Sequence, residues 1–552
     1  MSNIFFGDFE TTKPNDEGEV RVYLWSLVSG EYEQYGEDLE SFMELLQDLE
    51  GIIFFHNLKF DFSYIHYYLI ENNIPYTVLE KKGTYYSISF YGIQLRDTFN
   101  LMPMSLSEVG RNYNKQYFKT SIDYSVDFDH KATMEEIDYC INDTRVCEEG
   151  YHSFMNGMED IVRRSGAVKS IKKVRKKVTS PSIAFEVFKE LSNFEKLCPK
   201  TSNSEYDMLK GAYKGGYVYS NNQGIVENVK MIDCNSMYPF AYSTFPLPYG
   251  KGIKTTNINE LKNWKFYIAT IMIKYDLKEG YIPIIGGGIG RFGSGIYSSN
   301  SNNEYVELTV CNIDLERIKK YYDCDYELVY ASCYNVKEEF FKKYCDIFIE
   351  IKNNSTGVMR NLAKVMLNSP YGKTAMNGLS EIKKYSIDKE LKIIKSEITG
   401  YNIDSDMYQY LPIAIAITAY ARSVLFNEAE KIGYDNIYYM DTDSIKYKNI
   451  DNIKLNLNDY ELGAWKNEGE AILFKTIAPK KYVYYDGSKI NYTCAGFNKK
   501  SLESQIFHNQ KVSRDKAIEL MNNFDSGLEI LSLQSVVKKG GRAILEVNKK
   551  IT

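Results

Sequence analysis

The chain has 552 residues, of which 44% are hydrophobic, and a formal net charge of −6. This length accommodates several domains and the hydrophobic content excludes global disorder, while nine cysteines without a C-x-x-C spacing argue against a disulfide framework or a zinc site. With only five histidines, a metal site would have to use oxygen ligands, which Mg²⁺ prefers. We expect neither a signal peptide nor a membrane span, because the longest apolar run, 411–426, is interrupted by polar residues.

The first part of the chain alternates predicted strands and helices, which favours an α/β domain. Three runs have the pattern of strands: 3–10, 51–55 and 86–96. After them, Thr133 and Glu136 have the spacing of a capping box and predict the start of a helix.

Acidic side chains stand at the ends of these elements. Two share a face of the first strand, one opens the helix after the second strand, and one lies four residues after Tyr139 on the later helix. These four residues are Asp8, Glu10, Asp61 and Asp143. Each alone is more often a helix cap or a surface charge, but together they favour a two-metal nuclease site.

A basic segment, residues 163–177, is interpreted as a connection between domains. It contains no acid, and its cations are Arg163, Arg164, Lys169, Lys172, Lys173, Arg175, Lys176 and Lys177. A solvated basic face is the simple explanation, but so dense a charge favours contact with phosphates.

The second half contains a predicted hairpin, 436–447, with two carboxylates at its tip. Apolar and aromatic residues lead to Asp441-Thr442-Asp443-Ser444, after which the strand pattern resumes. Alone, this sequence is best explained as a polar turn. A separate buried strand ends at Asp233, a natural third carboxylate, and three such charges held together need a cation.

A predicted helix over 355–369 carries Arg360, Lys364 and Asn368 four residues apart on one face, and Pro370 ends it. A solvated stripe is the usual explanation, but a cationic row followed by Tyr371 is better suited to a triphosphate and a base.

Elsewhere the sequence predicts a hairpin between 373 and 410, helices over 411–431 and 513–523, and a final strand. The glycine-rich patch 285–295 lacks the Gly-Lys-Ser/Thr ending of a phosphate-binding loop and is expected to form flexible loops.

These segments, in this order, resemble the motifs of the family B DNA polymerases. Three are similar to the polymerase motifs: Asp233-x-x-Ser236-Met237-Tyr238-Pro239, Lys364-x-x-x-Asn368-Ser369-x-Tyr371-Gly372 and Tyr439-x-Asp441-Thr442-Asp443-Ser444. Met237 replaces the usual leucine, a change that conserves volume. Three more are similar to template and primer motifs: Tyr213-x-Gly215-Gly216, Thr418-x-x-Ala421-Arg422 and Lys480-x-Tyr482.

The N-terminal part is similar to the 3′→5′ exonuclease motifs of the same family. The matching residues are Asp8-x-Glu10, Asn57-x-x-Phe60-Asp61 and Tyr139-x-x-x-Asp143. Thr98-Phe99 stands where the family has Ser/Thr-Leu, and Lys119 where it has a lysine that assists catalysis.

The resemblance implies an α/β and α+β multidomain fold: an RNase H-like exonuclease domain and a right-hand polymerase domain of palm, fingers and thumb with two inserts. The expected domains are exonuclease 1–166, palm 167–244 and 411–505, first insert 245–338, fingers 339–377, second insert 378–410 and thumb 506–552. Inserts at these places are similar to those of protein-primed polymerases of small phages and linear plasmids. In these the first insert contacts a terminal protein and the second gives processivity and strand displacement.

The resemblance also implies roles for individual residues, with two Mg²⁺ per active site, or Mn²⁺ in their place. The implied metal ligands are Asp233, Asp441, Asp443 and the backbone of Cys234 for synthesis, and Asp8, Glu10, Asp61 and Asp143 for digestion, where Tyr139 orients the water and Lys119 assists. The implied nucleotide contacts are Tyr238, Lys352, Arg360, Lys364, Asn368 and Tyr371. The implied DNA contacts are Asn57, Phe60, Thr98, Phe99, Tyr213, Gly215, Gly216, Ser236, Gly372, Thr418, Arg422, Lys480 and Tyr482.

The implied partners are template–primer DNA, dNTPs and a separate terminal protein whose hydroxyl replaces the primer 3′-OH. Because only seven residues precede Asp8, we expect no fused terminal-protein domain. Single-strand- or double-strand-binding replication proteins are further expected partners. We expect a monomer, or a heterodimer with the terminal protein, in the cytoplasm of a bacterial host. Two alternatives stay open: a conventionally primed family B polymerase, and a DNA-binding nuclease with an inactive polymerase half.

Overall fold

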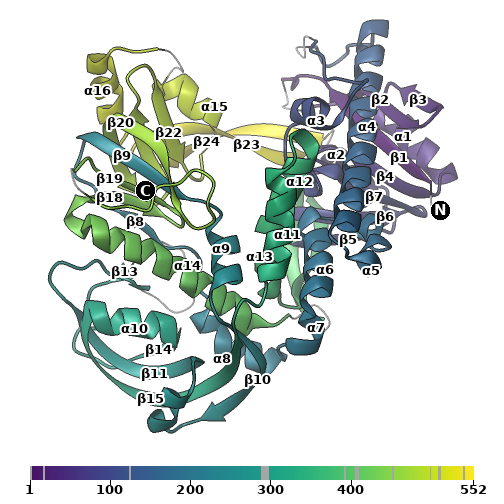
Figure 1. Ribbon diagram of the computed structural model, residues 1–552. Helices are drawn as coiled ribbons and strands as arrows, with labels where there is room; N and C mark the ends of the chain where they lie inside the picture. The colour runs from purple at the N-terminus through teal and green to yellow at the C-terminus, as the bar shows by residue number, and fades with distance from the viewer. Residues whose placement is uncertain are drawn as a thin grey trace.

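The computed structural model has an N-terminal domain and a C-terminal body, each built on a large sheet, with helices between them (Figure 1). The structure describes residues 3–16, 19–81, 83–122, 126–286, 297–390, 393–404, 409–450, 453–497, 499–507, 511–538 and 541–551. No helix in this described part of the chain combines the length and apolar character that crossing a membrane requires.

The N-terminal domain is a seven-stranded sheet of order β3-β2-β1-β4-β7-β6-β5 with helices on both faces. Its strands are β1 (Ile4–Thr11), β2 (Val22–Ser29), β3 (Tyr32–Gly36), β4 (Gly51–Phe55), β5 (Thr77–Lys81), β6 (Thr84–Phe90) and β7 (Ile93–Asp97). Its helices are α1 (Leu39–Leu45), α2 (Asp61–Glu71), α3 (Leu106–Tyr113) and α4 (Met134–Arg164). Phe9 on one face of β1 packs against Phe42 of α1, whereas Phe6 on the other face packs against Tyr151 of α4.

Sequence patterns predicted most of these elements. The strands over 3–10 and 51–55 and the capping box of Thr133 and Glu136 are confirmed. The prediction of one strand over 86–96 is wrong, because β6 and β7 form a hairpin there. Tyr91 and Gly92 at its turn have φ of 51° and 86°, the positive values that a tight two-residue hairpin needs.

The basic segment 163–177 runs from the end of α4 through α5 (Val168–Ile171) to the helix α6 (Ser180–Ser192). Lys173 and Lys177 both pair with Glu186 at 2.9 Å, and Arg175 pairs with Glu159 at 2.6 Å. Part of the charge predicted to meet phosphates is therefore neutralised by acids of neighbouring helices.

Short helices continue this connection to a second helical group. The short helices are α7 (Phe194–Leu197) and α8 (Asn203–Leu209). The second helical group consists of α11 (Lys342–Asn353), α12 (Gly357–Asn368) and α13 (Pro370–Thr374). As predicted, the helix of the cationic row ends before Pro370, which starts the next short helix. Helix α12 packs on α4, and an added Cβ at Gly157 would lie 2.8 Å from Leu362 Cδ1, so the contact is close.

A second seven-stranded sheet, of order β22-β21-β20-β9-β19-β18-β8, forms the centre of the C-terminal body. Its strands are β8 (Val218–Ser220), β9 (Val226–Cys234), β18 (Ile437–Asp441), β19 (Ser444–Lys448), β20 (Trp465–Ala478), β21 (Lys481–Tyr485) and β22 (Ile490–Cys494). Helices α9 (Met237–Thr244) and α14 (Leu411–Ile432) pack together beside it. The predicted helix over 411–431 is confirmed, and most of its residues are buried, consistent with its mainly apolar sequence.

The segment 245–338 forms a four-stranded sheet of order β10-β15-β11-β14, with α10 packed against it. Its elements are β10 (Leu247–Thr255), β11 (Phe266–Leu277), β14 (Val306–Cys311), α10 (Asn312–Tyr321) and β15 (Tyr322–Lys337), with the small pair β12 (Ile285–Gly286) and β13 (Tyr297–Ser298). The expectation of flexible loops in the glycine-rich patch concerns residues 287–295, which lie outside the described residues.

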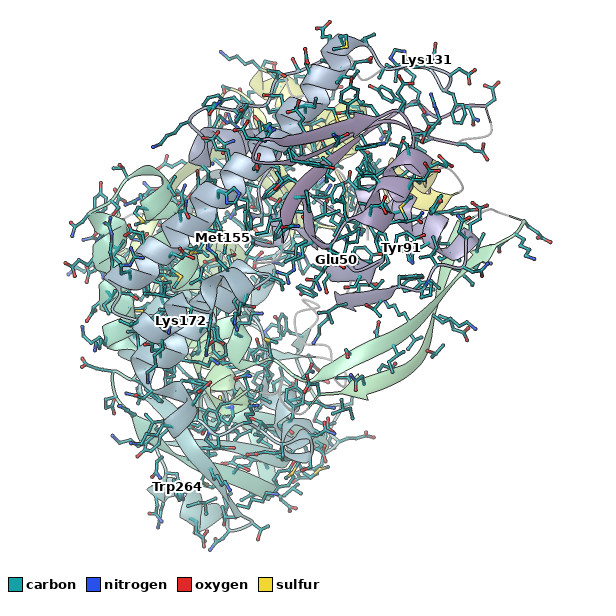
Figure 2. All side chains as sticks on the ribbon, turned by 90° about the vertical axis from the view of Figure 1, so that its right-hand side faces the viewer. Glu50, Tyr91, Lys131, Met155, Lys172 and Trp264 are labelled. Atoms are coloured by element: carbon teal, nitrogen blue, oxygen red, sulfur yellow. The ribbon has the colours of Figure 1, made fainter. Side chains whose placement is uncertain are left out.

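Two hairpins far apart in the sequence form the sheet β16-β17-β23-β24. The first, β16 (Leu379–Asp388) and β17 (Ile393–Ile403), is the hairpin predicted between 373 and 410 and stands out as a long light-green pair in Figure 2. The second, β23 (Glu529–Lys538) and β24 (Gly541–Lys550), follows α15 (Lys499–Leu502) and the predicted helix α16 (Arg514–Asn523). Ile393 pairs with Lys538, and α2 of the N-terminal domain contacts both hairpins.

Glu80 on β5 attaches the first hairpin to the N-terminal domain. Lys383 Nζ donates to its carboxylate at 2.7 Å and the Tyr385 hydroxyl at 2.6 Å, while Tyr385 packs edge-on against His66. Burial alone would raise the pKa of Glu80, but the hydrogen bonds from Lys383 and Tyr385 outweigh burial and lower it. The carboxylate is therefore charged and doubly bonded at neutral pH.

We expect Glu80→Ala to loosen this hairpin, because Lys383 and Tyr385 lose their shared acceptor. Hydrogen bonds to a charged group contribute about 1.5 kcal/mol or more, so proteolytic cleavage within 379–403 should become roughly tenfold faster. Limited proteolysis followed by mass spectrometry measures this rate. Glu397→Ala, which removes an exposed acid from β17 of the same hairpin, is the matched control. Equal cleavage of the two variants would contradict the attachment.

Candidate functional site

The first carboxylate site, defined as Asp8, Glu10, Asp61 and Asp143, lies between β1, α2 and α4. Asp8 and Glu10 are on the face of β1 that meets α4, and Asp61 is the first residue of α2. Asp143 comes from the third turn of α4, four residues after Tyr139. The structure thus brings the four predicted acids into one electrostatic cluster.

Burial and mutual repulsion hold protons on this cluster. Burial, followed by the charge of Asp143, raises the pKa of Asp8 to about 7, and burial followed by Asp8 raises that of Glu10 to about 9. Asp61 is shifted upward as well, first by burial and then by Asp8. A divalent cation is the partner that would let all four carboxylates ionise together.

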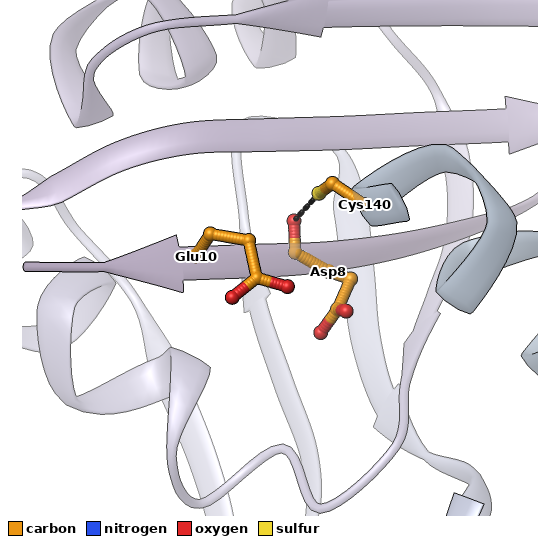
Figure 3. A group of neighbouring side chains, drawn as sticks. All are labelled: Asp8, Glu10 and Cys140. Atoms are coloured by element: carbon orange, nitrogen blue, oxygen red, sulfur yellow. Dashed lines mark hydrogen bonds between the residues drawn. The ribbon is translucent and has the colours of Figure 1, made fainter. Parts of the chain in front are cut away.

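Unsatisfied oxygen atoms indicate the same need for a cation. Asp61 and Asp143 are 2% and 1% exposed, and Oδ1 of each has no hydrogen-bond partner among the described residues. Asp8 and Glu10, drawn in Figure 3, place oxygen atoms within 4.8 Å of each other and of the Cys140 sulfur. The carboxylates are hard donors that suit Mg²⁺ or Mn²⁺, whereas the Cys140 thiol faces the Asp8 carbonyl at 3.8 Å.

Lys119 lies at the edge of the first carboxylate site. Its ammonium donates to the Tyr139 hydroxyl at 2.9 Å and pairs with the Asp143 carboxylate. This charge lowers the pKa of Asp143 and partly offsets the effect of burial, which is the larger of the two. The structure therefore groups Lys119 with Tyr139 and Asp143.

The other N-terminal residues expected to contact DNA lie near Asp97, whose carboxylate holds two loop segments together. Asp97 Oδ1 accepts from the backbone N–H groups of Asn57 at 2.9 Å and Phe99 at 2.8 Å. Phe99 is exposed and Phe60 is half-buried, so both rings reach the surface. Thr98 is buried and its hydroxyl bonds Phe55 O and His56 Nδ1, so its side chain supports the loop from inside. Its contact with DNA stays a prediction. Sequence reasoning missed Asp97 and His56, whose only signal was their place at strand ends.

The second carboxylate site, defined as Asp233, Asp441 and Asp443, lies at the tip of β18 and β19. Ser444 of β19 pairs with Asp233 of β9, and Cys234 N–H donates to Asp443 O at 2.7 Å. Burial, followed by the charges of Asp443 and Glu468, raises the pKa of Asp233 to about 6, and burial raises that of Asp443. Strand pairing across more than 200 residues thus gathers the three aspartates.

Lys480 holds one of these aspartates in this state of the molecule. Its ammonium lies 3.2 Å from Asp441 Oδ2, and its backbone N–H donates to the Tyr439 hydroxyl at 3.0 Å. Within the described residues, the three aspartates do not form a group whose ligand atoms all lie within 4.8 Å of one another, as Asp8, Glu10 and Cys140 do. The Cys234 side chain is buried, so this residue can contribute to the site only through its backbone.

The turn of the second site fits against Gly216. Thr442 has φ of 55°, its N–H donates to Tyr217 O at 2.9 Å, and an added Cβ on Gly216 would lie 2.1 Å from Thr442 Oγ1. Glycine is needed here because the Thr442 side chain occupies the space a Cβ would fill. Added Cβ atoms on Gly215 and Gly372, in contrast, would meet nothing within 4 Å.

The partly buried aromatic rings of Tyr238 and Tyr371 stack beside this site. Their centroids are 3.9 Å apart at an angle of 17°. Ser236, which precedes Tyr238, caps α9 with φ of 53°, and Tyr213 packs partly buried nearby. The stacked pair presents a ring surface between the carboxylates and α12.

The cationic row of α12 is exposed over its length, as its spacing predicted. Arg360, Lys364 and Asn368 reach solvent, and Arg360 Nη1 donates to Lys352 O at 2.9 Å. Burial, then the charges of Arg360 and Lys364, lowers the pKa of Lys352. An anion in contact with this row would relieve the repulsion among the three cations.

The side chains of Thr418 and Arg422 on α14 form hydrogen bonds inside the protein. The Thr418 hydroxyl is buried and donates to Ala414 O at 3.0 Å, within its own helix. Arg422 is 6% exposed, forms an ion pair with Asp314 of α10 at 2.6 Å, and donates to the carbonyls of Lys214 and Gly215. These internal bonds let Arg422 hold the segment before Gly216. The DNA contacts expected of Thr418 and Arg422 stay a prediction.

We expect Gly216→Ala to displace the turn of the second site, because its new Cβ overlaps Thr442. Overpacking of this kind costs about 1–3 kcal/mol, which should lower the unfolding temperature in calorimetry. Thr442→Gly removes the opposing side chain and suits the positive φ of that position. The double variant Gly216→Ala/Thr442→Gly should therefore recover most of the lost temperature; no recovery would contradict this close approach.

Comparisons with known proteins cover both carboxylate sites. The family model described as DNA polymerase type B, organellar and viral, matches residues 43–134 and 127–462. The DNA polymerase of Bacillus phage Nf is 28% identical over 518 residues, covering 87% of this chain and 86% of that protein. That of Bacillus phage phi29 is 28% identical over 564 residues, covering 92% and 93%. The solved structure of phi29 DNA polymerase with primer-template DNA and incoming nucleotide substrates covers 100% of both chains, with a TM-score of 0.84 and 25% identity.

Proposed function

Because this chain belongs to the type B DNA polymerases of organelles and viruses, we propose that it is a protein-primed replicative polymerase that also proofreads through a separate 3′→5′ exonuclease site. The family and the phage relatives make it a DNA-directed DNA polymerase. The fold expected from the motifs, an exonuclease domain with palm, fingers and thumb, is confirmed by the likeness to phi29 DNA polymerase. The finer assignments below are our proposals.

Synthesis takes place at the second carboxylate site. The observation that carries this is the pairing of Ser444 with Asp233, which brings the Asp441–Asp443 turn beside a third carboxylate. Asp233 and Asp443 would be the principal ligands of two Mg²⁺, with Asp441 and the Cys234 backbone beside them. When bound, the ions lower the pKa of the attacking hydroxyl and stabilise the leaving pyrophosphate.

The neighbouring side chains bind and orient the substrates. Lys352, Arg360 and Lys364 neutralise the triphosphate, Lys364 most directly, and Asn368 extends the row. Tyr371 packs on the incoming base while Tyr238, stacked against it, excludes a ribose 2′-OH. Lys480, which pairs with Asp441 in this structure, would bind the primer strand, and Tyr482 would hold the primer end.

Digestion takes place at the first carboxylate site. Asp8, Glu10, Asp61 and Asp143 would hold the two ions, and the buried Oδ1 atoms of Asp61 and Asp143, which bond no other described residue, would supply ligand positions. Tyr139 orients the attacking water and Lys119, bonded to it, fixes its hydroxyl. The exposed Phe99 and the half-buried Phe60 bind the unpaired primer end.

The two inserts give this polymerase its mode of replication. The sheet of 245–338 contacts a terminal protein, whose hydroxyl takes the place of the primer 3′-OH. The hairpin of 378–410 meets the C-terminal hairpin at Ile393 and Lys538 and closes around DNA, which supports processivity and strand displacement. The host is a bacterial cell in which a phage or plasmid genome replicates.

Two substitutions separate the two sites. Asp443→Ala should abolish primer extension and leave single-strand digestion intact, because the sites are on different sheets on opposite sides of the molecule (Figure 1). The double variant Asp8→Ala/Glu10→Ala should do the reverse, with a loss of at least about 100-fold expected from removal of metal ligands. Gel assays of extension and digestion measure both, with circular dichroism as the control for folding. Loss of both activities in either folded variant would contradict the two-site assignment.

Protein priming is tested with labelled nucleotide. Incubation with template DNA, a candidate terminal protein and labelled dATP should transfer label onto that protein, since its hydroxyl replaces the primer end. Label that appears only when a DNA primer is present would favour a conventionally primed polymerase. Absence of any primer extension would favour a nuclease with an inactive polymerase half.

A further inference from the structure

A buried lysine, Lys446, lies beneath the second carboxylate site and belongs to none of the motifs. It is the third residue of β19 and is 8% exposed. No carboxylate in the described part of the chain lies within 4.0 Å of its ammonium, so it forms no ion pair there. Burying a charge is costly unless something compensates it.

Two tyrosine rings provide the compensation. Lys446 Nζ lies 4.8 Å from the centre of the Tyr482 ring and 5.4 Å from that of Tyr439, and the two ring centres are 4.9 Å apart. An ammonium over an aromatic face is attracted by the ring quadrupole, more strongly where water is excluded. The lysine thus bridges the rings of two different strands, β18 and β21.

Strand pairing places this lysine on the reacting face of the sheet. Lys446 pairs with Tyr439, and Asp441 is two residues further along β18, so the three share a face. Ser444, two residues before Lys446, pairs with Asp233 on that same face. The charge of Lys446 is therefore directed toward the side of the sheet that carries the carboxylates.

We propose that Lys446 is a positioning residue, which seats Tyr482 for the primer end and balances the carboxylates before the metals bind. This inference rests on the proposed polymerase function and extends it to a residue outside the motifs. Lys446 acts through Tyr482, since its ammonium lies against the ring and not against a substrate group.

The two lysines of this site have different tasks. Lys480 has a side chain 50% exposed and bonds Asp441 directly, so it can leave that carboxylate for a primer phosphate. Lys446 is enclosed by Tyr439 and Tyr482 and keeps its position when Lys480 moves. Lys480 thus changes its partner during the reaction, whereas Lys446 keeps its partners and is part of the fold.

The test is steady-state primer extension by the full chain with primer–template DNA varied. Lys446→Met should raise the KM for primer–template about tenfold and leave kcat within about twofold, because Tyr482 loses its seat while the metal ligands remain. Lys446→Arg, which also stacks on aromatic rings, should stay within about threefold of the unchanged chain. Lys448→Met, the same change at an exposed position of the same strand, is the matched control.

A double-mutant cycle asks whether Lys446 acts through Tyr482. With Tyr482→Leu already present, Lys446→Met should change KM by less than about twofold, since neighbouring residues that act together are not additive. Additive effects, an unchanged KM in Lys446→Met, or an arginine variant as impaired as the methionine variant would each overturn the proposal.

Failure by unfolding is kept separate. If Lys446→Met has a lowered unfolding temperature, Lys446→Gln and Lys446→Arg replace it, and the proposal requires raised KM in the first and near-normal KM in the second. An unchanged chain that extends no primer overturns the proposed polymerase function itself. Extension by the unchanged chain with equal KM in all folded variants overturns this inference alone.

Discussion

The pairing of β19 with β9 is the contact on which the second carboxylate site depends. Ser444 opposite Asp233 and the bond from Cys234 N–H to Asp443 O set where the Asp441–Asp443 turn lies relative to the third aspartate. A slip by one residue would turn these side chains to the other face of the sheet. Gly216 fits the turn from outside, because any Cβ there would meet Thr442.

Near that strand pairing, a buried charge is compensated by partners from distant segments of the chain. Arg422 inside α14 joins Asp314 of the first insert to the carbonyls before Gly216, so the insert and the turn share one buried ion pair. Removing one partner of such a pair leaves an uncompensated charge, which is why these bonds hold their elements firmly. At the first carboxylate site, Oδ1 of Asp61 and Oδ1 of Asp143 find no such partner among the described residues, and a cation would compensate both.

The N-terminal domain is coupled to the rest of the chain by packing as well as by charge. Helix α4, which carries Tyr139 and Asp143, also packs against α12, which carries the cationic row. Glu80 fastens the long hairpin to the same domain through Lys383 and Tyr385. The surroundings of the two carboxylate sites thus share elements, although the sites belong to separate sheets.

The sequence by itself determined the family, the acids and cations of both sites, and the helices and strands in which local spacing shows a face, such as Arg360, Lys364 and Asn368 on α12. Local patterns suffice there because the period of a helix or strand depends on neighbouring residues alone. The spacing of residues did not reveal the turn at Tyr91 and Gly92, because polar and apolar residues alternate in the same way before and after it within the run 86–96. Only the tertiary structure decided that Arg422 turns inward to Asp314, 108 residues away, and that Lys446 lies against Tyr482. The physical reason is that the partner of a buried charge is chosen by the pairing of distant strands and helices, which no local period encodes.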